Sequence, residues 1–295
     1  MGYIFLMLSL AAGTIKGYCG KQTSRCVNEY RDAMLANFVR MILCSIIGLI
    51  AVIFSNDIHL LAFNRTEMLI AFLSGAANSA FVVLWLMAVK KDAYMMLDVF
   101  CMIGILIPMI GSTALFGESI ETKHVLGVAI LIVAVCIMCS YNNSIKSRHT
   151  ISNVIILIMC GISNGLSDFS QKLFMKMSDG VAVAVFNFYT YAISSLVLLV
   201  CWLISVGVSK TRDCISLKPI LRYIAIMSIC LFACSYYKTL AAGLIPSAQL
   251  YPAAQGGALI ISSIMSIVLF KEKPNAKLVI GISMSFVALM VINIL

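Results

Sequence analysis

The amino-acid sequence predicts an all-α membrane protein of ten transmembrane helices, arranged as two inverted repeats of five helices each. Three observations support this fold class. The chain of 295 residues is 62% hydrophobic and only 11% charged, with a mean hydropathy of +1.03. Its hydrophobic residues fall into long runs that are separated by short polar linkers. A charged segment, LFGESIETK at 115–123, returns in a similar form as LFKEKPNAK at 269–277.

The composition excludes a soluble globular protein. Such proteins carry about a quarter charged residues, and this chain has too few charges to cover a water-facing surface of its size. In hydrocarbon the backbone must satisfy its own hydrogen bonds, which makes helices the expected element. The net charge of +9 comes from cations in short linkers, without a basic stripe and interleaved aromatic residues. We therefore expect contacts with membrane lipid and no binding of nucleic acid.

Apolar runs of about 18 residues or more predict membrane-spanning helices. The predicted spans cover residues 2–20, 33–55, 67–89, 93–116, 123–141, 151–175, 181–208, 219–243, 246–270 and 275–295. The first run has no A-x-A-like cleavage site, so we expect a retained helix, with Lys16 near its end extending its amine to the membrane surface. No linker is long enough for a soluble domain. The longest, at 141–150, divides the chain into predicted five-helix repeats at 1–143 and 150–295.

The two halves match at further positions, in the same order and at nearly constant offsets. The matched pairs are Lys21 with Lys172, Asn37 with Asn187, Glu118 with Glu272 and Gly127 with Gly281, together with the GxxxG pairs Gly13/Gly17 and Gly161/Gly165. Because five is an odd number, each half must enter the bilayer from the opposite side. Such inverted repeats suit alternating access to a substrate that is held between them near the membrane midplane.

This layout, with a glutamate after spans four and nine, resembles the drug/metabolite transporter superfamily, specifically the EamA-like family. The resemblance covers essentially the whole chain and is carried by LFGESIETKHVLGVAILIVAV, LFKEKPNAKLVIGISMSFVAL, Lys21 and Lys172. The chain departs from the family at Ala12-Gly13, where Trp-Gly is often found. The resemblance implies a secondary transporter of a small organic metabolite in a bacterial cytoplasmic (plasma) membrane, with export as one option. It also implies a cavity lined by the first four helices of each repeat, with spans five and ten peripheral or facing a homodimer or paralogous partner.

Two glutamates are predicted to stand in the tight turns before spans five and ten, namely Glu118 and Glu272. Unpaired amides and the positive end of a helix favour a carboxylate at such a place. We expect both residues to have a structural role in these turns. The functional alternative is a gate or a proton-binding site.

Polar and ionisable residues inside the predicted spans are costly and are therefore candidates for contacts with the substrate. The candidates are Arg40, Asn78, Trp85, Asp98, Asn164, Asp168, Tyr236, Tyr237, Lys238, Gln249, Tyr251 and Gln255. Asn164 and Asp168 are four residues apart and share one helical face, as do Tyr251 and Gln255. A cavity with both charge signs and aromatic groups suits a zwitterion or another small polar organic solute. The structural alternative is that Arg40 pairs with an aspartate and locks two helices together.

The sequence has no recognisable catalytic arrangement. The three histidines lie in or beside linkers, and no nucleophile elbow, metal motif or phosphate loop is present. Most of the eleven cysteines lie inside apolar runs, where free cysteine behaves as a small hydrophobic residue. We therefore expect no enzyme activity, no metal and no cofactor, and a secondary transport mechanism in which Asp98, Asp168 or Glu118 could bind protons.

Two other functions remain open at this point. The first is efflux of multiple drugs or cationic compounds, which acidic groups in the cavity favour and which Arg40 and Lys238 oppose. The second is a membrane enzyme or receptor, which would need a catalytic cluster or a seven-span plan that the sequence does not show. Binding tests with amino acids, sugars and quaternary cations would separate metabolite transport from cation efflux.

The orientation in the membrane is a further open point. Fourteen Lys and Arg residues fall in linkers on one side of the predicted bundle and four fall on the other side. The positive-inside rule then places both termini outside the cell, whereas members of the resembled family usually keep both termini in the cytoplasm. A reporter fused to either terminus would distinguish the two orientations.

Overall fold

The structure is a computed structural model that describes residues 1–61, 65–90, 101–102, 104–139, 151–178, 182–208, 218–270 and 276–293. These residues form α-helices and one short 3-10 helix, with no β-strand in the described ranges. The elements are α1 (Gly2–Ser24), α2 (Tyr30–Phe54), η1 (Ile58–Leu61), α3 (Arg65–Lys90), α5 (Leu106–Phe116), α6 (Thr122–Cys139), α8 (Ile151–Met177), α9 (Val183–Val208), α10 (Leu221–Leu244), α11 (Ser247–Phe270) and α12 (Ala276–Asn293). The all-helical prediction is therefore confirmed.

Each of the ten predicted apolar ranges overlaps one of these α-helices. In the fourth range α5 begins at Leu106, residues 101, 102 and 104 are also helical, and residues 93–100 and 103 lie outside the described residues. The predicted boundary between the two repeats, at 141–150, lies outside the described residues. The division into repeats at 1–143 and 150–295 therefore stays a prediction.

Five helices of the described chain are long and apolar enough to cross a membrane. They are α1, α2, the Arg65–Val89 part of α3, the Val183–Gly207 part of α9, and α10. Leu106–Phe116, Thr122–Ala134 and Val279–Ile292 are apolar but shorter. Large hydrophobic side chains stand exposed in the middle of helices, for example Ile46, Leu196 and Ile229. These features are consistent with an integral membrane protein, whereas the ten-span arrangement is taken up below as a proposal.

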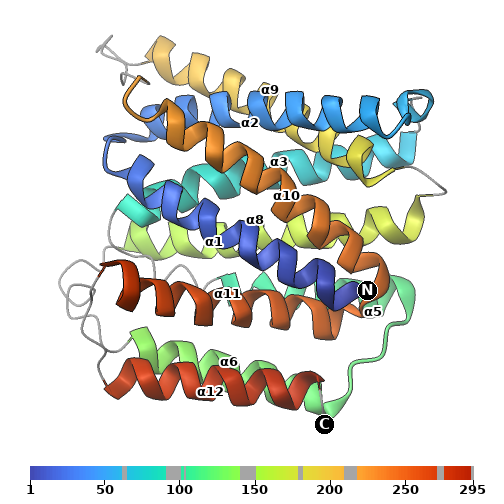
Figure 1. The fold of residues 1–295 in the computed structure, drawn as a ribbon, viewed down its shortest axis with the longest axis vertical. Coiled ribbons are helices and arrows are strands. Elements are labelled where there is room, and N and C mark those ends of the chain that lie inside the picture. Colours follow the sequence, from blue (N-terminus) through green and yellow to red (C-terminus); the bar gives the residue numbers. More distant parts are fainter. Residues whose placement is uncertain are drawn as a thin grey trace.

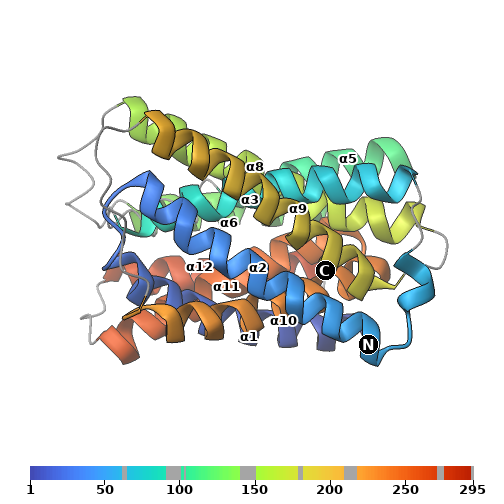
Figure 2. The same cartoon turned by 90° about the horizontal axis from the view of Figure 1, so that it is seen from above.

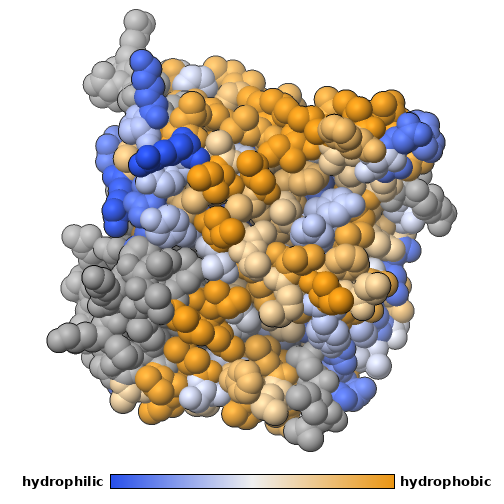
Figure 3. All heavy atoms as spheres, viewed as in Figure 1, coloured by the Kyte–Doolittle hydropathy of each residue, from blue (hydrophilic) through white to orange (hydrophobic). Residues whose placement is uncertain are grey.

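The helices run alongside one another across the molecule, so that their ends gather at two opposite edges (Figure 1). On the face shown in Figure 3, hydrophobic residues form a broad band between these edges, and hydrophilic residues gather toward the edges themselves. An exposed apolar band of this kind is expected where a surface faces lipid.

The most extensive helix contacts join α1 with α10, α2 with α9, α3 with α8, and α6 with α12. Figure 2 shows that α1 and α10 lie toward one face of the bundle and that α3 and α8 lie toward the opposite face. Helices α6 and α12 lie side by side at the lower end of the row of helices (Figure 1). A β-carbon added to Gly127 of α6 would overlap Ile292 of α12. Helices α2 and α9 lie at the opposite end of the row of helices in Figure 1, and α1, α3, α8, α10 and α11 lie between.

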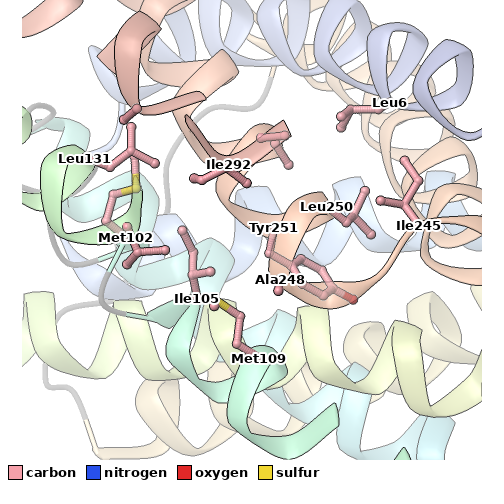
Figure 4. Close-up of a cluster of buried hydrophobic side chains, with 14 of the residues drawn as sticks. Leu6, Met102, Ile105, Met109, Leu131, Ile245, Ala248, Leu250, Tyr251 and Ile292 are labelled. Carbon is pink, nitrogen blue, oxygen red and sulfur yellow. The ribbon is translucent and has the colours of Figure 1, made fainter. Parts of the chain in front are cut away.

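A buried hydrophobic cluster connects α11 to its neighbours (Figure 4). It includes Leu6 of α1, Met109 of α5, Leu131 of α6 and Ile292 of α12. Tyr251 of α11 is completely buried in this cluster. Because lipid is as apolar as these side chains, such a cluster stabilises a membrane bundle mainly through close van der Waals packing.

Two helix ends show why the chain turns where it does. At the start of α2, the Asp32 carboxylate accepts the backbone N–H of Asn28 at 3.0 Å and that of Glu29 at 3.3 Å, so two amides of the helix start are satisfied. At the end of α5, Gly117 has a φ of 65°, the left-handed conformation that commonly terminates helices. This reversal places Glu118 immediately beyond the end of α5.

Candidate functional site

The centre of the candidate site is an ion pair between Asp168 of α8 and Lys238 of α10. The Lys238 ammonium donates to Oδ1 of Asp168 at 2.6 Å. The Asp168 side chain is 4% exposed and the Lys238 side chain is 14% exposed. Oδ2 of Asp168 is buried and has no hydrogen-bond partner in the described chain. The sequence predicted both residues as candidates, and the structure brings them together.

Tyr251 connects this pair to a third helix. Its hydroxyl donates to the backbone carbonyl of Asp168 at 2.7 Å, and the Lys238 ammonium lies 5.7 Å from the centre of its ring. This second distance is within the range of a cation–π interaction. Three helices, α8, α10 and α11, therefore hold the pair in place.

Aromatic rings precede Lys238 on α10. Tyr237 stacks on Phe5 of α1, with ring centres 6.2 Å apart. Tyr236 meets Tyr237 edge to face at 5.7 Å and lies 5.9 Å from Phe232. Both tyrosines were candidates from sequence, and the structure gives them packing partners within the bundle rather than a place in an isolated aromatic belt.

A chain of uncharged polar groups runs beside the ion pair, and sequence reasoning missed it. Gln171 donates to the Ser235 hydroxyl at 3.4 Å, and Ser235 donates to Oδ1 of Asn187 at 2.7 Å. Gln171 and Ser235 stand three residues from Asp168 and Lys238 on their own helices, so they face the same direction. That spacing was the available signal. Oε1 of Gln171 is buried without a hydrogen-bond partner in the described chain.

Arg40 of α2 is almost completely buried, with 3% of its surface exposed. Its Nε atom has no hydrogen-bond partner among the described residues. The Cys44 thiol, one turn after Arg40, donates to the backbone carbonyl of Ser228 at 3.4 Å, and the hydroxyl of Ser228 donates to the Arg40 backbone carbonyl at 3.2 Å. The Asp168 carboxylate is bound by Lys238 and Asp98 lies outside the described residues, so the pairing of Arg40 with an aspartate stays a prediction.

Lys16 also belongs to this region, although its snorkelling to the membrane surface was expected. Helix α1 continues to Ser24, so Lys16 stands two turns inside the helix rather than one. It shares a helical face with Gly13, which packs against Cys234 of α10, and with Gly20. It is partly buried and interacts electrostatically with Asp168.

The other candidates lie at some remove from the ion pair or have structural partners. Asn78 donates to Ser194 at 3.1 Å and to Sδ of Met41 at 3.4 Å. The ring of Trp85 packs against Gly20 of α1, and Gln249 accepts the hydroxyl of Tyr3 at 3.3 Å at an exposed position.

Three further candidates complete the set. Asn164 is buried one turn before Asp168, and its Nδ2 has no hydrogen-bond partner in the part of the chain that the structure describes. Gln255 is half-buried one turn after Tyr251. Asp98 lies outside the described residues, as does Glu272.

A second ion pair lies at the end of the bundle, between Glu118 and Lys172. The Lys172 ammonium contacts Oε1 of Glu118 at 2.7 Å and donates to the backbone carbonyls of Ala242 and Ile245 at 3.0 Å each. The other Glu118 oxygen accepts the backbone N–H of Ser247 at 2.8 Å. Lys172 thus binds the end of α10, and Glu118 binds the start of α11.

This arrangement refines the role expected for Glu118. The sequence placed Glu118 in a turn and suggested that it would bind the helix that follows, α6. The amide that Glu118 accepts in the structure belongs to α11. Burial alone would raise the pKa of Glu118, but the hydrogen bonds from Lys172 and from the Ser247 amide outweigh it. The pKa of Glu118 is consequently held below its ordinary value of 4.5.

Replacing Glu118 with Gln is expected to change the response of stability to acid. Because the folded-state pKa lies below the unfolded one, the carboxylate stabilises the fold above about pH 4.5, and this stabilisation is lost as the pH falls through the folded-state value. E118Q should be less stable than wild type by about 1.5–3 kcal/mol at neutral pH. The two should converge in acid when unfolding midpoints are measured in detergent.

A matched control is E121Q, whose carboxylate is 57% exposed and pairs with Lys123 at 3.0 Å. Exposed pairs of this kind contribute about 0–1 kcal/mol, so E121Q should follow wild type throughout. Parallel curves for wild type and E118Q at every pH would contradict the role given to the Glu118 carboxylate.

Comparisons with known proteins give a fold and no family. No family model matches the sequence, and no curated protein matches it. Among solved structures, 28 chains match the fold. One of them, described only as "Crystal structure of protein", superposes with a TM-score of 0.75 at 11% sequence identity, over 99% of this chain and 96% of its own length. A likeness at this identity concerns the fold alone, so function has to be argued from the site.

Proposed function

We propose that the chain is a secondary transporter that moves a small organic metabolite across a bacterial cytoplasmic membrane. The observation that carries this proposal is the buried Asp168–Lys238 pair, surrounded by polar atoms that lack partners, in the interior of an apolar helix bundle. Charged groups at such a depth are costly, and in membrane proteins they mark substrate or ion pathways. We expect the substrate to bind beside this pair.

The pattern of helix contacts supports the arrangement as two inverted five-helix repeats, 1–143 and 150–295. The proposal matches α1 with α8, α2 with α9, α3 with α10, α5 with α11 and α6 with α12. If the two helices of each matched pair are exchanged, an observed contact should correspond to another observed contact or to itself. The α1–α10 contact corresponds to α8–α3, the α3–α9 contact to α10–α2, and the α1–α11 contact to α8–α5. The contacts α2–α9 and α6–α12 convert into themselves. Contacts of this kind are expected from a two-fold relation between the halves.

Matched residues also make matched bonds. Asn37 of α2 donates to the carbonyl of Ala33 at 2.9 Å, and Asn187 of α9 donates to that of Val183 at 3.1 Å. Together with the repeated glutamates and lysines of the sequence, this supports the EamA-like plan. In that plan α6 and α12, at the edge of the bundle, face lipid, a second copy of the chain or a paralogous partner.

Alternating access follows from this plan in physical terms. The substrate would stay near the Asp168–Lys238 pair while the two repeats rock against each other and open the site to one side at a time. Efflux of cationic compounds is a weaker candidate. The described charged groups beside Asp168 are the cations Lys16 and Lys238, and these repel a cationic solute.

The test is an untargeted comparison of metabolites, inside and outside cells, with and without the protein. One group of small polar metabolites should be redistributed by wild type. Asp168→Asn should abolish this redistribution at equal abundance in the membrane, because Lys238 would lose its charged partner. We expect the same of Asp98→Asn, whereas the exposed control E121Q should act as wild type. Redistribution at the wild-type level by both aspartate variants would remove these carboxylates from the mechanism.

A further inference from the structure

Among the described residues, the interior of the bundle holds more positive than negative charge, and this excess indicates what the substrate carries. Lys16, Arg40 and Lys238 lie within α1, α2 and α10, and all three are buried or partly buried. In the described chain, Asp168 is bound by Lys238 and interacts electrostatically with Lys16. Two cations, Lys16 and Arg40, are therefore left without an ion pair to a described carboxylate.

Of the two cations, Arg40 has the higher free-energy cost when it lacks a paired anion, because it is more deeply buried. A buried guanidinium without a paired anion costs several kcal/mol of solvation free energy. Its Nε donor has no acceptor among the described residues, although the side chain is almost completely buried. A planar guanidinium with a free N–H is the group that binds carboxylates and phosphates with two parallel hydrogen bonds. The missing partner of Arg40 is thus best supplied by an anionic ligand.

The position of Lys16 extends this site toward the ion pair. Lys16 lies on the face of α1 between Gly13, which packs against Cys234 of α10, and Gly20, which lies beside Met227 of α10. Ser228, which donates to the Arg40 carbonyl, belongs to the same stretch of α10, and Lys16 interacts electrostatically with Asp168. Because these groups are shielded from water, their attraction for an anion is stronger than it would be at the surface.

Two buried acceptors at the other end also lack partners, namely Oδ2 of Asp168 and Oε1 of Gln171. They would accept hydrogen bonds from a hydroxyl or amino group on the same ligand. The separation can be estimated along α10. The Ser228 hydroxyl of α10 bonds the Arg40 carbonyl, and Lys238 follows ten residues later on the same helix, a rise of about 15 Å.

We propose that Arg40 and Lys16 bind the anionic group of the transported molecule, so that the substrate is a small organic acid that also carries a hydroxyl or amino group. This inference rests on the proposed transport function and specifies the substrate class of the same site. A zwitterion fits only if its negative group reaches Arg40. Neutral solutes and simple cations leave the two interior cations uncompensated.

The first test measures binding with the detergent-solubilised full chain. The probes are L-malate, glycerol 3-phosphate, L-serine and inorganic phosphate, with glycerol and choline as neutral and cationic comparisons at matched ionic strength. At least one of the organic anions should raise the unfolding temperature of wild type. R40Q should weaken that binding by about 10- to 100-fold, as expected for loss of a hydrogen bond to a charged group, and R40K should weaken it less.

The matched control is R222Q, since Arg222 is exposed and stacks on Tyr223 at 4.7 Å. It should bind every probe as wild type does. If R40Q does not fold, K16Q provides the same comparison from the neighbouring helix and should also weaken anion binding. Stabilisation by none of the anions, or equal stabilisation of wild type and R40Q, would overturn the proposal.

Two outcomes separate this inference from the transport proposal. If choline or glycerol stabilises wild type and is carried into proteoliposomes, the anion class is wrong and transport stands. If an organic anion binds through Arg40 but does not cross the membrane of proteoliposomes, the binding site stands and transport is wrong. A third outcome would overturn the proposal. If R40Q lowers the unfolding temperature, the double variant R40Q/D98N restores it and no anion stabilises wild type, then Arg40 pairs with Asp98 and not with a substrate.

Discussion

Replacing Lys238 with Met should lower the stability of the protein by about 3–5 kcal/mol and abolish transport. The substitution keeps an unbranched side chain, one atom shorter than lysine, and removes the ammonium that now contacts Asp168 at 2.6 Å. Asp168 would then be a buried carboxylate without an ion-pair partner in the described chain except the more distant Lys16. The unfolding temperature in detergent and the transport rate in proteoliposomes measure the two effects separately.

The double variant D168N/K238M separates charge balance from function. It removes both charges at once, so most of the stability lost in K238M should return. Transport should stay absent, because neither group that we expect at the substrate remains ionised. Wild-type stability in K238M alone would show that the pair is not energetically coupled, and active D168N/K238M would show that transport does not need it.

Replacing Gly165 with Val should have the second large effect, because the backbone of α8 closely approaches the backbone at Gly104, just before α5. A β-carbon on Gly165 would overlap the carbonyl oxygen of Gly104, and one on Gly104 would overlap the carbonyl oxygen of Gly161. Backbone atoms cannot rotate away as a flexible side chain can. Close helix contacts through small residues are a common means of helix association in membranes. We expect a loss of about 1–3 kcal/mol or more, seen as a lower unfolding temperature and reduced abundance.

Gly207→Val is the matched control for this substitution. Gly207 also lies in a helix, and a β-carbon there would meet no atom within 4 Å. The same change in volume and helix propensity should therefore have little effect at Gly207. Equal destabilisation by the two substitutions would assign the effect to helix propensity rather than to the close approach of α8 to the backbone at Gly104.

Much of the local structure could be predicted from the sequence. Long apolar runs dictate helices because hydrocarbon leaves the backbone no other hydrogen-bond partners, and every predicted run overlaps one. The cost of placing charge inside such a run identified Asp168 and Lys238 as candidates. The turn at Glu118 was also predictable, because Gly117 ends α5 in the left-handed conformation that favours glycine.

The partners of these residues could not be predicted, because they come from distant parts of the chain. Lys238 meets Asp168 across 70 residues, and Glu118 meets Ser247 across 129 residues. Such contacts depend on how helices pack, which hydrophobic periodicity does not specify. Gln171 and Ser235 were not predicted from the sequence for another reason. They are uncharged and carry little cost inside a helix, so only their spacing from the ion pair marks them.

The contacts of Lys172 also determine where α10 can move. Its ammonium joins the last carbonyls of α10 to the Glu118 turn. We therefore expect this end of α10 to act as the fulcrum, or fixed point, if the helix tilts. Helix α10 has 24 residues, a lever arm of about 36 Å. A swing of about 10° around the fulcrum would carry the far tip through about 6 Å, wide enough for a small solute to pass while the pivot stays still.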